Sequence, residues 1–196
     1  MINIEYEATF PNINKNNIRN RLKKAKAKLI KKEFLQKRVV FNFPEYHEIK
    51  GGWIRIRDEN DKVTMSLKIV NGTKIRDQKE ICLEVNSLKQ AEVFLTYLGC
   101  KKKAYQESKR ELWILDGTEV TIDEWPFLEP FVEIEGKTEK AVKNASKKLG
   151  FDYSKALFCS VGTLYNNKYN ISEEIINNKT PIIAFNRKNP FLKTKQ

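Results

Sequence analysis

The sequence is poor in the residues on which several common enzyme mechanisms depend. His47 is the only histidine among 196 residues, so a Ser-His-Asp arrangement or a histidine-rich metal site would rest on this one side chain. The cysteines Cys82, Cys100 and Cys159 are widely separated and include no C-x-x-C pair of the kind found in zinc and redox sites. We therefore set these mechanisms aside and interpret the cysteines as reduced packing residues.

Long apolar runs are also absent from the sequence. No stretch approaches the roughly 20 residues that a membrane-spanning helix needs, and residues 1–10 lack a basic region followed by an apolar one. We therefore expect a cytoplasmic protein without a membrane partner. Because 40% of the residues are hydrophobic, the chain can bury a sizeable core as a single domain.

Acidic residues are outnumbered by basic ones, 25 to 37, which gives a net charge of +12 and favours an anionic partner. Residues 15–32 contain no acidic residue, and their apolar positions predict an amphipathic helix over residues 16–30 with a basic outer face. This face is either solvated or binds nucleic acid. It lacks interleaved aromatic side chains on which bases could stack, so a nucleic acid is the less favoured partner.

Much of the chain shows the alternation of polar and apolar residues that is typical of β-strands. Turns at Gly51-Gly52, Asn71-Gly72 and Asp116-Gly117 join these segments, which predicts antiparallel neighbours. The expected strands cover residues 4–10, 34–43, 53–57, 63–70, 79–85, 105–115, 120–124 and 131–135.

Between the strands, Ser87 and Gln90 form the capping box of a helix that ends at Gly99. Its periodicity predicts that five residues point inward, namely Leu88, Ala91, Phe94, Leu95 and Leu98.

Two further helices are expected near the C-terminus, over residues 138–149 and 154–165. The tail after Asn170 is rich in Asn, Lys and Pro, which predicts a loosely packed or partly disordered extension. We therefore divide the chain into a domain of residues 1–170 and an extension of residues 171–196.

Charged residues repeatedly occupy one face of the predicted strands, and the opposite face is apolar. If the apolar faces pack against helices, the charged faces must surround a hydrated space, as they do in a closed antiparallel barrel. The alternative is an open sheet whose exposed face carries cross-strand salt bridges. The charged or polar faces include Glu5 and Glu7, Arg55 and Arg57, Thr64, Ser66 and Lys68, Glu80 and Glu84, and Glu133 and Glu135.

A lumen that holds carboxylates together with Arg and Lys side chains suits one kind of ligand. Paired carboxylates bind a hard cation such as Mg²⁺ or Mn²⁺, and the metal can bridge phosphate oxygens. Guanidinium and ammonium groups then bind the remaining phosphate charge. The expected ligand is a metal-bound polyphosphate.

Five short motifs occur in the order found in one family, and through them the chain resembles the CYTH family of triphosphate tunnel metalloenzymes. This family contains class IV adenylyl cyclases, thiamine triphosphatases and inorganic tripolyphosphatases. The motifs are EYE at 5–7, similar to the family's E-x-E-x-K strand, WIRIR at 53–57, similar to L-R-I-R, SLK at 66–68, which matches the lysine strand, SKR at 108–110, similar to K-x-R, and VTIDEWPFLEPFVEIE at 120–135, similar to LDE…LGxFVEIE.

The resemblance implies an α+β fold in which an eight-stranded antiparallel barrel, flanked by helices, binds a triphosphate and one or two divalent metals, Mg²⁺ or Mn²⁺. It assigns metal binding to Glu5, Glu7, Glu133 and Glu135, with Asp123 close by, and catalysis to Glu5, Glu7 and Glu135. The residues that would bind phosphate or substrate are Arg55, Arg57, Lys68 and Arg110, with Lys168 as a match near the C-terminal end and Arg38 as a further candidate in the lumen.

Thr9 occupies the position where the family pattern has a lysine. In family triphosphatases that lysine is linked to positioning or activating the nucleophile, and a hydroxyl cannot supply the same charge. The resemblance therefore implies an activity that is slow, altered or lost.

Two reactions fit this resemblance: hydrolysis of a triphosphate, or cyclisation of ATP to cyclic AMP with release of pyrophosphate. ATP, thiamine triphosphate and tripolyphosphate are the expected small-molecule partners. The alternatives are a non-catalytic tunnel that binds a nucleotide or polyphosphate, and a nucleic-acid binder that uses the basic helix. A homodimer is compatible with the sequence, which leaves the oligomeric state open.

Overall fold

The alternating segments pair with their neighbours around a barrel, as the computed structural model shows for residues 2–192. The strands of the barrel are β1 (Asn3–Ile4), β2 (Tyr6–Phe10), β3 (Lys28–Asn42), β4 (Gly52–Asp58), β5 (Val63–Val70), β6 (Gln78–Val85), β7 (Lys101–Leu115), β8 (Thr118–Glu124) and β9 (Phe131–Gly136). They follow the order β1-β6-β5-β4-β3-β7-β8-β9-β2, and every neighbouring pair is antiparallel.

The first strand closes the barrel because it changes partner at Glu5. β1 pairs with β6, whereas β2 pairs with β9 at the other edge of the sheet. At the change of partner, the Glu5 backbone N–H donates to the Gln78 carbonyl at 3.0 Å, and the Gln78 side-chain amide donates to the Glu7 carbonyl at 2.7 Å. Counted as one interrupted strand, β1 and β2 complete the predicted eight-stranded barrel.

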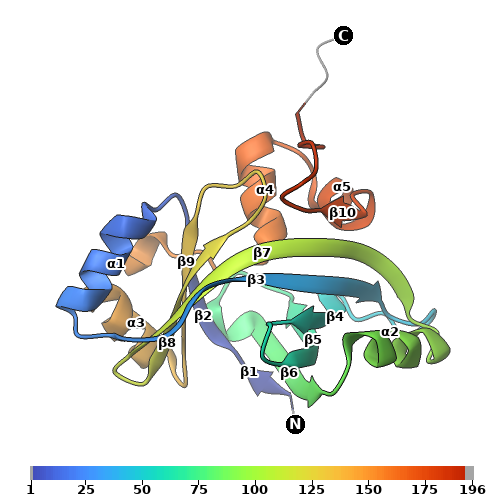
Figure 1. Ribbon diagram of the computed structural model, residues 1–196, viewed down its shortest axis with the longest axis horizontal. Helices are drawn as coiled ribbons and strands as arrows, with labels where there is room; N and C mark the ends of the chain where they lie inside the picture. Colours follow the sequence, from blue (N-terminus) through green and yellow to red (C-terminus); the bar gives the residue numbers. More distant parts are fainter. Residues whose placement is uncertain (1, 193–196) are drawn as a thin grey trace.

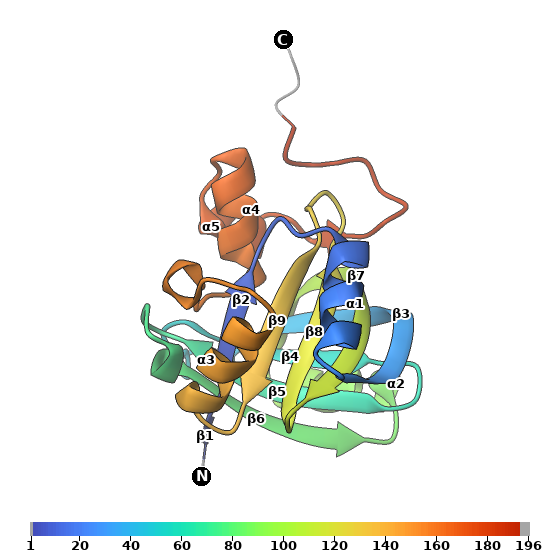
Figure 2. The same ribbon diagram turned by 90° about the vertical axis from the view of Figure 1, so that its left-hand side faces the viewer.

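Helices cover the apolar outer faces of the barrel, as predicted. Figures 1 and 2 show α1 (Lys15–Lys24) and α3 (Glu139–Lys148) beside β2, β8 and β9, whereas α2 (Leu88–Tyr97) lies at the opposite side. The first core contains Leu22, Val142, Ile122 and Ile134, and the second contains Val39, Ile56, Ala91 and Leu95. Most strands therefore turn their apolar face outward against a core and their polar face toward the lumen, although Ile81 and Leu83 on the outer face of β6 are 40% and 54% exposed.

The first helix is shorter than the range of residues 16–30 that its apolar spacing predicts. It ends at Lys24, and Lys26 adopts a left-handed conformation with φ of 59°. The Ala27 N–H donates to the Leu22 carbonyl at 2.9 Å and closes the last turn. Residues 28–30, expected in the helix, instead begin β3, because β3 pairs with β7 along most of its length.

Helix α2 begins and ends as predicted, but two of its apolar side chains do not point inward. The Ser87 hydroxyl accepts the Gln90 N–H at 3.3 Å, and Gly99 follows the helix with φ of 85°. Ala91 and Leu95 are buried, whereas Phe94 and Leu98 are each 55% exposed. A ten-residue helix on the convex outside of a barrel contacts it along a stripe narrower than the predicted apolar face.

Residues 156–160 are not helical although a helix was predicted over residues 154–165. The tail after Asn170 is packed more closely than predicted. A short 3-10 turn (Tyr153–Lys155) leads to Leu157, whose backbone N–H and carbonyl bond to Thr9 at 3.0 and 2.9 Å. α4 (Val161–Tyr169), α5 (Glu173–Asn178) and β10 (Ile182–Ile183) follow. β10 pairs in parallel with β7, and Ile176 and Ile183 are buried against Trp125 and Tyr165. No helix among the residues described is long and apolar enough to cross a membrane.

Two glycines with similar backbone angles provide a matched test of the turn before β4. Gly51 has φ of 72°, and a Cβ on it would lie 2.2 Å from the Val70 carbonyl oxygen. Gly117 has φ of 77°, and a Cβ there would have no atom within 4 Å. We expect Gly51→Ala to lower the free energy of unfolding by roughly 2 to 4 kcal/mol and Gly117→Ala by only about 1 kcal/mol. Urea denaturation of both variants measures the difference, and equal losses would show that the close approach to Val70 is unimportant.

Candidate functional site

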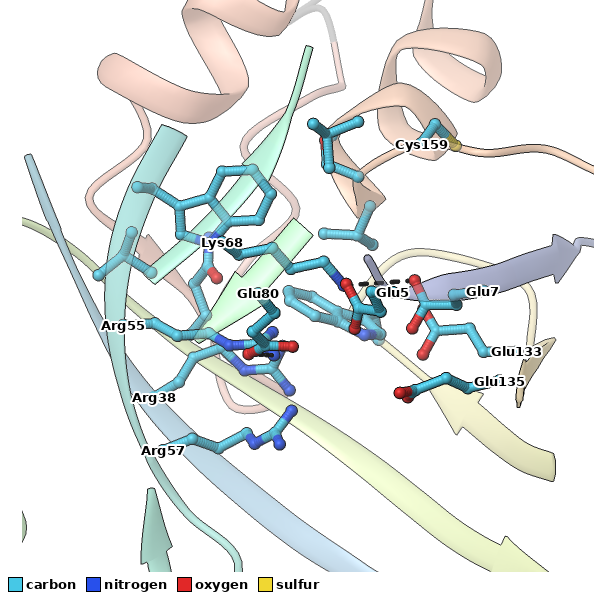
Figure 3. A pocket seen from close by; sticks show the side chains of 18 of the residues that line it. Glu5, Glu7, Arg38, Arg55, Arg57, Lys68, Glu80, Glu133, Glu135 and Cys159 are labelled. Atoms are coloured by element: carbon cyan, nitrogen blue, oxygen red, sulfur yellow. Dashed lines mark hydrogen bonds and ion pairs between the residues drawn. The ribbon is translucent and has the colours of Figure 1, made fainter. Parts of the chain in front are cut away.

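The inward faces of the strands enclose a cavity of about 1180 Å³. Figure 3 shows that its two sides differ in charge: arginines from β3 and β4 lie on one side, with Glu80 of β6 among them, and carboxylates from the β1–β2 strand and β9 lie on the other. Lys68 of β5 reaches between them. The basic side consists of Arg38, Arg55 and Arg57, and the acidic side consists of Glu5, Glu7, Glu133 and Glu135.

Three carboxylates form a compact cluster on the acidic side. Glu7 and Glu135 are partners in the β2–β9 register, and one oxygen from each of Glu5, Glu7 and Glu135 lies within 4.8 Å of the others. The Lys68 ammonium lies 2.7 Å from Glu5 and 3.3 Å from Glu7. The cluster contains only oxygen donors, and this is the ligand type that hard divalent cations prefer.

A single ammonium does not neutralise this cluster. Burial raises the pKa of Glu5 to about 9 although Lys68 opposes the shift, and burial together with Glu7 raises the pKa of Glu135 to about 7. Burial acts to lower the pKa of Lys68, but Glu7 and Glu5 outweigh it and raise that pKa. The carboxylates thus repel one another when ionised, and an added cation would relieve the repulsion.

Most arginines of the cavity have a carboxylate partner. Arg55 donates to Ser66 at 3.0 Å and to Glu80 at 3.1 Å, and Arg57 lies 2.7 Å from Glu59. Burial acts to raise the pKa of Glu80, but Arg55 and Lys68 outweigh it and hold this pKa well below its usual range. Glu80 and Glu59 were not among the predicted site residues, although alternation with Ile81 and Leu83 placed Glu80 on the inner face.

Arg38 differs from the other arginines because no carboxylate pairs with it within residues 2–192. Its guanidinium donates to Gln36 at 3.0 Å and to Ser108, and it lies over the Trp125 ring with Cζ 4.2 Å from the centroid. Burial and the nearby Arg55 lower the pKa of Arg38 well below its usual value. A buried guanidinium in this state favours an anionic ligand.

Asp123 was predicted near the metal, but the structure places it behind Arg110. The Arg110 guanidinium binds both oxygens of Asp123, at 2.7 and 2.9 Å, and also donates to Glu133 at 2.6 Å. Thr121 donates a further hydrogen bond to Asp123, which is fully buried. Arg110 and Glu133 line the cavity, whereas Asp123 positions Arg110.

Lys168 lies away from the charged cluster, whereas Thr9 lies beside it but does not line the cavity. The Lys168 ammonium binds Glu129 and the Phe127 carbonyl, each at 2.8 Å, and does not line the cavity. Thr9 is only 3% exposed, pairs with Glu133 in the β2–β9 register and also bonds to Leu157. Thr9 therefore stands beside the acidic side of the lumen but is covered by the segment that contains Leu157.

The fold and the site thus define a closed antiparallel barrel whose lumen presents carboxylates opposite guanidinium groups. The sequence places this chain in a particular family: residues 1–160 match the CYTH domain, and the chain belongs to the CYTH domain family.

Solved structures share this fold at low sequence identity. The PH1012 protein from Pyrococcus horikoshii OT3 has a TM-score of 0.67 and 20% identity, over 82% of this chain and 98% of that one. A "putative adenylate cyclase" from Vibrio parahaemolyticus has a TM-score of 0.71 and 12% identity, over 84% and 98%. A "putative adenylyl cyclase" from Hippeastrum, described as having a dominant triphosphatase activity, has a TM-score of 0.53 and 15% identity, over 83% and 95%. No curated protein sequence matched the chain.

The raised pKa of Glu135 predicts how the metal-free protein responds to pH. Between the usual carboxyl pKa and about 7, the folded state holds a proton that the unfolded chain releases, so stability falls as pH rises through this interval. In chelator, Glu135→Gln should therefore raise the free energy of unfolding by about 1 kcal/mol or less at pH 8, because solvent screens this exposed side chain, and by less still at pH 5. Glu48→Gln, at an exposed position, is the control. An equal gain at both pH values would mean that the amide acts through packing alone.

Proposed function

We propose that this protein is a divalent-metal-dependent enzyme that acts on the triphosphate of a nucleotide or of another small organic molecule inside the barrel. The observation that carries the proposal is the opposition of the Glu5, Glu7 and Glu135 cluster to the arginines of β3 and β4 across one cavity. A triphosphate with a bound cation carries positive charge for the acidic side and negative charge for the basic side.

The donor set of the acidic side fits Mg²⁺ or Mn²⁺. Glu5, Glu7 and Glu135 would hold the ion, with Glu133 beside them and held by Arg110. The Glu5 Oε2 atom is buried and contacts the Lys68 ammonium at 2.7 Å, so the metal would share this carboxylate with Lys68. A bound divalent ion would supply Lewis-acid polarisation of a phosphoryl oxygen.

The cationic side chains would bind and orient the phosphates. Arg55 and Arg57 lie two residues apart on β4 and face the same space, and Arg38 adds a guanidinium that pairs with no carboxylate among residues 2–192. Lys68 and Arg110 add cations on the acidic side, where they contact Glu5 and Glu133. Charge stabilisation by such fixed groups accounts for much of the catalysis of phosphoryl transfer.

The reaction would end in one of two ways. If water attacks the terminal phosphorus, the protein is a triphosphatase; if a ribose hydroxyl attacks the α phosphorus, it is an adenylyl cyclase that releases pyrophosphate. The proteins of this fold from Vibrio and Hippeastrum are described in terms of these same two activities. Incubation with Mg²⁺ or Mn²⁺ and ATP, thiamine triphosphate or tripolyphosphate, followed by mass analysis of the products, distinguishes them. Binding without turnover would identify a non-catalytic tunnel.

The nucleic-acid alternative finds less support in the structure. The basic helix α1 directs Lys15 toward Glu33 and Glu124, and Arg19 lies 2.8 Å from Glu111. These ion pairs hold part of its charge against β3, β7 and β8, so the helix is less available to a phosphate backbone. Salt-dependent binding of an oligonucleotide tests this alternative.

Replacing one arginine should separate phosphate binding from structural ion pairing. Arg55→Gln removes a guanidinium that faces the cavity, and we expect kcat/KM for a triphosphate to fall about 100-fold or more. Lys168→Gln removes a cation outside the cavity, and we expect kcat/KM to stay within about twofold of the wild type. If Arg55→Gln changes only the melting temperature, the guanidinium forms a structural ion pair with Glu80 and does not bind the substrate.

Thr9 supplies a second test, because its neighbours suit a cation. A lysine at this position would lie in register with Glu133 and on the face of Glu7, so its ammonium would have carboxylate partners. If the family geometry is retained, Thr9→Lys should raise triphosphate hydrolysis by about 5- to 150-fold, which corresponds to roughly 1 to 3 kcal/mol. Thr9→Met controls for side-chain length. A folded, metal-binding Thr9→Lys variant that is no faster would show that the hydroxyl belongs to a different chemistry.

A further inference from the structure

Three consecutive lysines begin β7, and of these three the last lines the cavity. Lys101 and Lys102 are exposed, and their ammonium groups lie 4.0 Å from Glu45 and 3.6 Å from Glu92. Lys103 is half-buried and belongs to the lining of the cavity. Neighbouring residues of one composition thus have different surroundings, and the strand pairing explains the difference.

A β-bulge in β7 gives Lys103 its orientation. Val40 of β3 pairs with Ala104, but the next residue, Phe41, pairs with Lys102, so Lys103 is the extra residue of β7. Phe41 is buried in the core beneath α2, whereas Val40 and Ala104 line the cavity. Without the extra residue, Lys103 would oppose Phe41 and point into that core. A bulge can re-aim a side chain in this way, and here it directs a lysine toward the lumen.

The strand register sets Lys103 level with two cations of the proposed phosphate site. The rung that contains Ala104 continues through Val40 to Arg55 of β4. Lys68 of β5 lies one inward-facing position from this rung, on the same side of it as Lys103. Because neighbouring strands are about 5 Å apart, β7 lies roughly 10 Å from β4 along the wall. A ligand held by Arg55 and Lys68 is therefore within reach of a long side chain from β7.

The Lys103 ammonium has no ion-pair partner within residues 2–192, unlike the ammonium groups of the two lysines before it. α5 packs against β7, and β10 pairs with Tyr105 and Gln106. Burial lowers the pKa of Lys103, although the Glu174 carboxylate of α5 opposes the shift. An anion that enters the cavity would stabilise this partly desolvated ammonium.

We propose that Lys103 is a further phosphate-binding residue: its ammonium contacts the triphosphate from β7, while Arg55 and Lys68 contact it from β4 and β5. This inference rests on the proposed function. Lys103 lies outside the five family motifs, and alternation along β7 would place it on the outer face with Tyr105. The bulge therefore adds to the lumen a cation that no local pattern assigns to it.

Three variants test the contact with Mg²⁺ and either ATP or tripolyphosphate as substrate. Lys103→Gln removes the ammonium, and we expect KM to rise about 10- to 100-fold and kcat to change by less than about threefold, because the contact holds substrate and transition state alike. Lys103→Arg keeps a cation and should stay within about threefold of the wild type. Lys102→Gln removes the same charge from the adjacent outer position and should stay within about twofold.

Two measurements besides turnover separate binding from a structural role. Calorimetry with tripolyphosphate and Mg²⁺ should show for Lys103→Gln the same loss in affinity as the change in KM. Its melting temperature should not fall, because the ammonium has no ion pair to lose. In the wild type, bound tripolyphosphate should slow the reductive methylation of Lys103 and leave the rates at Lys101 and Lys102 unchanged, as read by mass spectrometry.

A folded Lys103→Gln variant with unchanged affinity and KM would overturn the inference, and so would a methylation rate at Lys103 that bound tripolyphosphate does not change. An equal loss in Lys102→Gln would overturn it as well, because net charge alone would then explain the effect. If the wild type binds neither ATP nor tripolyphosphate with Mg²⁺, the proposed function itself fails. That result is distinct from a wild type that binds both compounds no better than Lys103→Gln does.

Discussion

The charge inside the barrel is the constraint on which the rest of the structure depends. Buried ions are stable only when opposite charges or hydrogen bonds compensate them. Arg110 with Asp123 and Arg55 with Glu80 meet this condition within the protein. The Glu5, Glu7 and Glu135 cluster, which one lysine contacts, does not meet it, and neither does Arg38, which pairs with no carboxylate in the described part of the chain. The unmet charge lies on opposite sides of one cavity, and for this reason the lumen suits a ligand that carries both signs.

The seam of the barrel and the acidic cluster depend on the same residue. Glu5 lies where the first strand leaves β6 and joins β9, and its backbone hydrogen bond to Gln78 helps to close the sheet. Its carboxylate belongs to the proposed metal site. Closure of the barrel and assembly of the site are therefore one event, because Glu5 reaches Glu135 only when β2 pairs with β9.

Residues 161–192 extend the barrel and add the carboxylates of Glu173 and Glu174 to the lining of the cavity. β10 takes an edge of β7 beyond the last β7–β8 pair, and Ile176 and Ile183 fill a core that includes Trp125. Trp125 also stacks on Arg38, so the packing of residues 161–192 and the orientation of this arginine are linked.

Alternation along the sequence determined which side chains share a face: Arg55 with Arg57 and Glu5 with Glu7 followed from the period of two in a strand. The same alternation predicted the eight strands of the barrel. Capping residues predicted the helix starts at Ser87 and Thr138, because a cap depends on neighbours within a few residues. Only the tertiary structure placed Asp123 behind Arg110, turned Lys168 toward Glu129 and brought Lys103 to the cavity. These positions follow from contacts between residues distant in sequence, and no local pattern encodes such contacts.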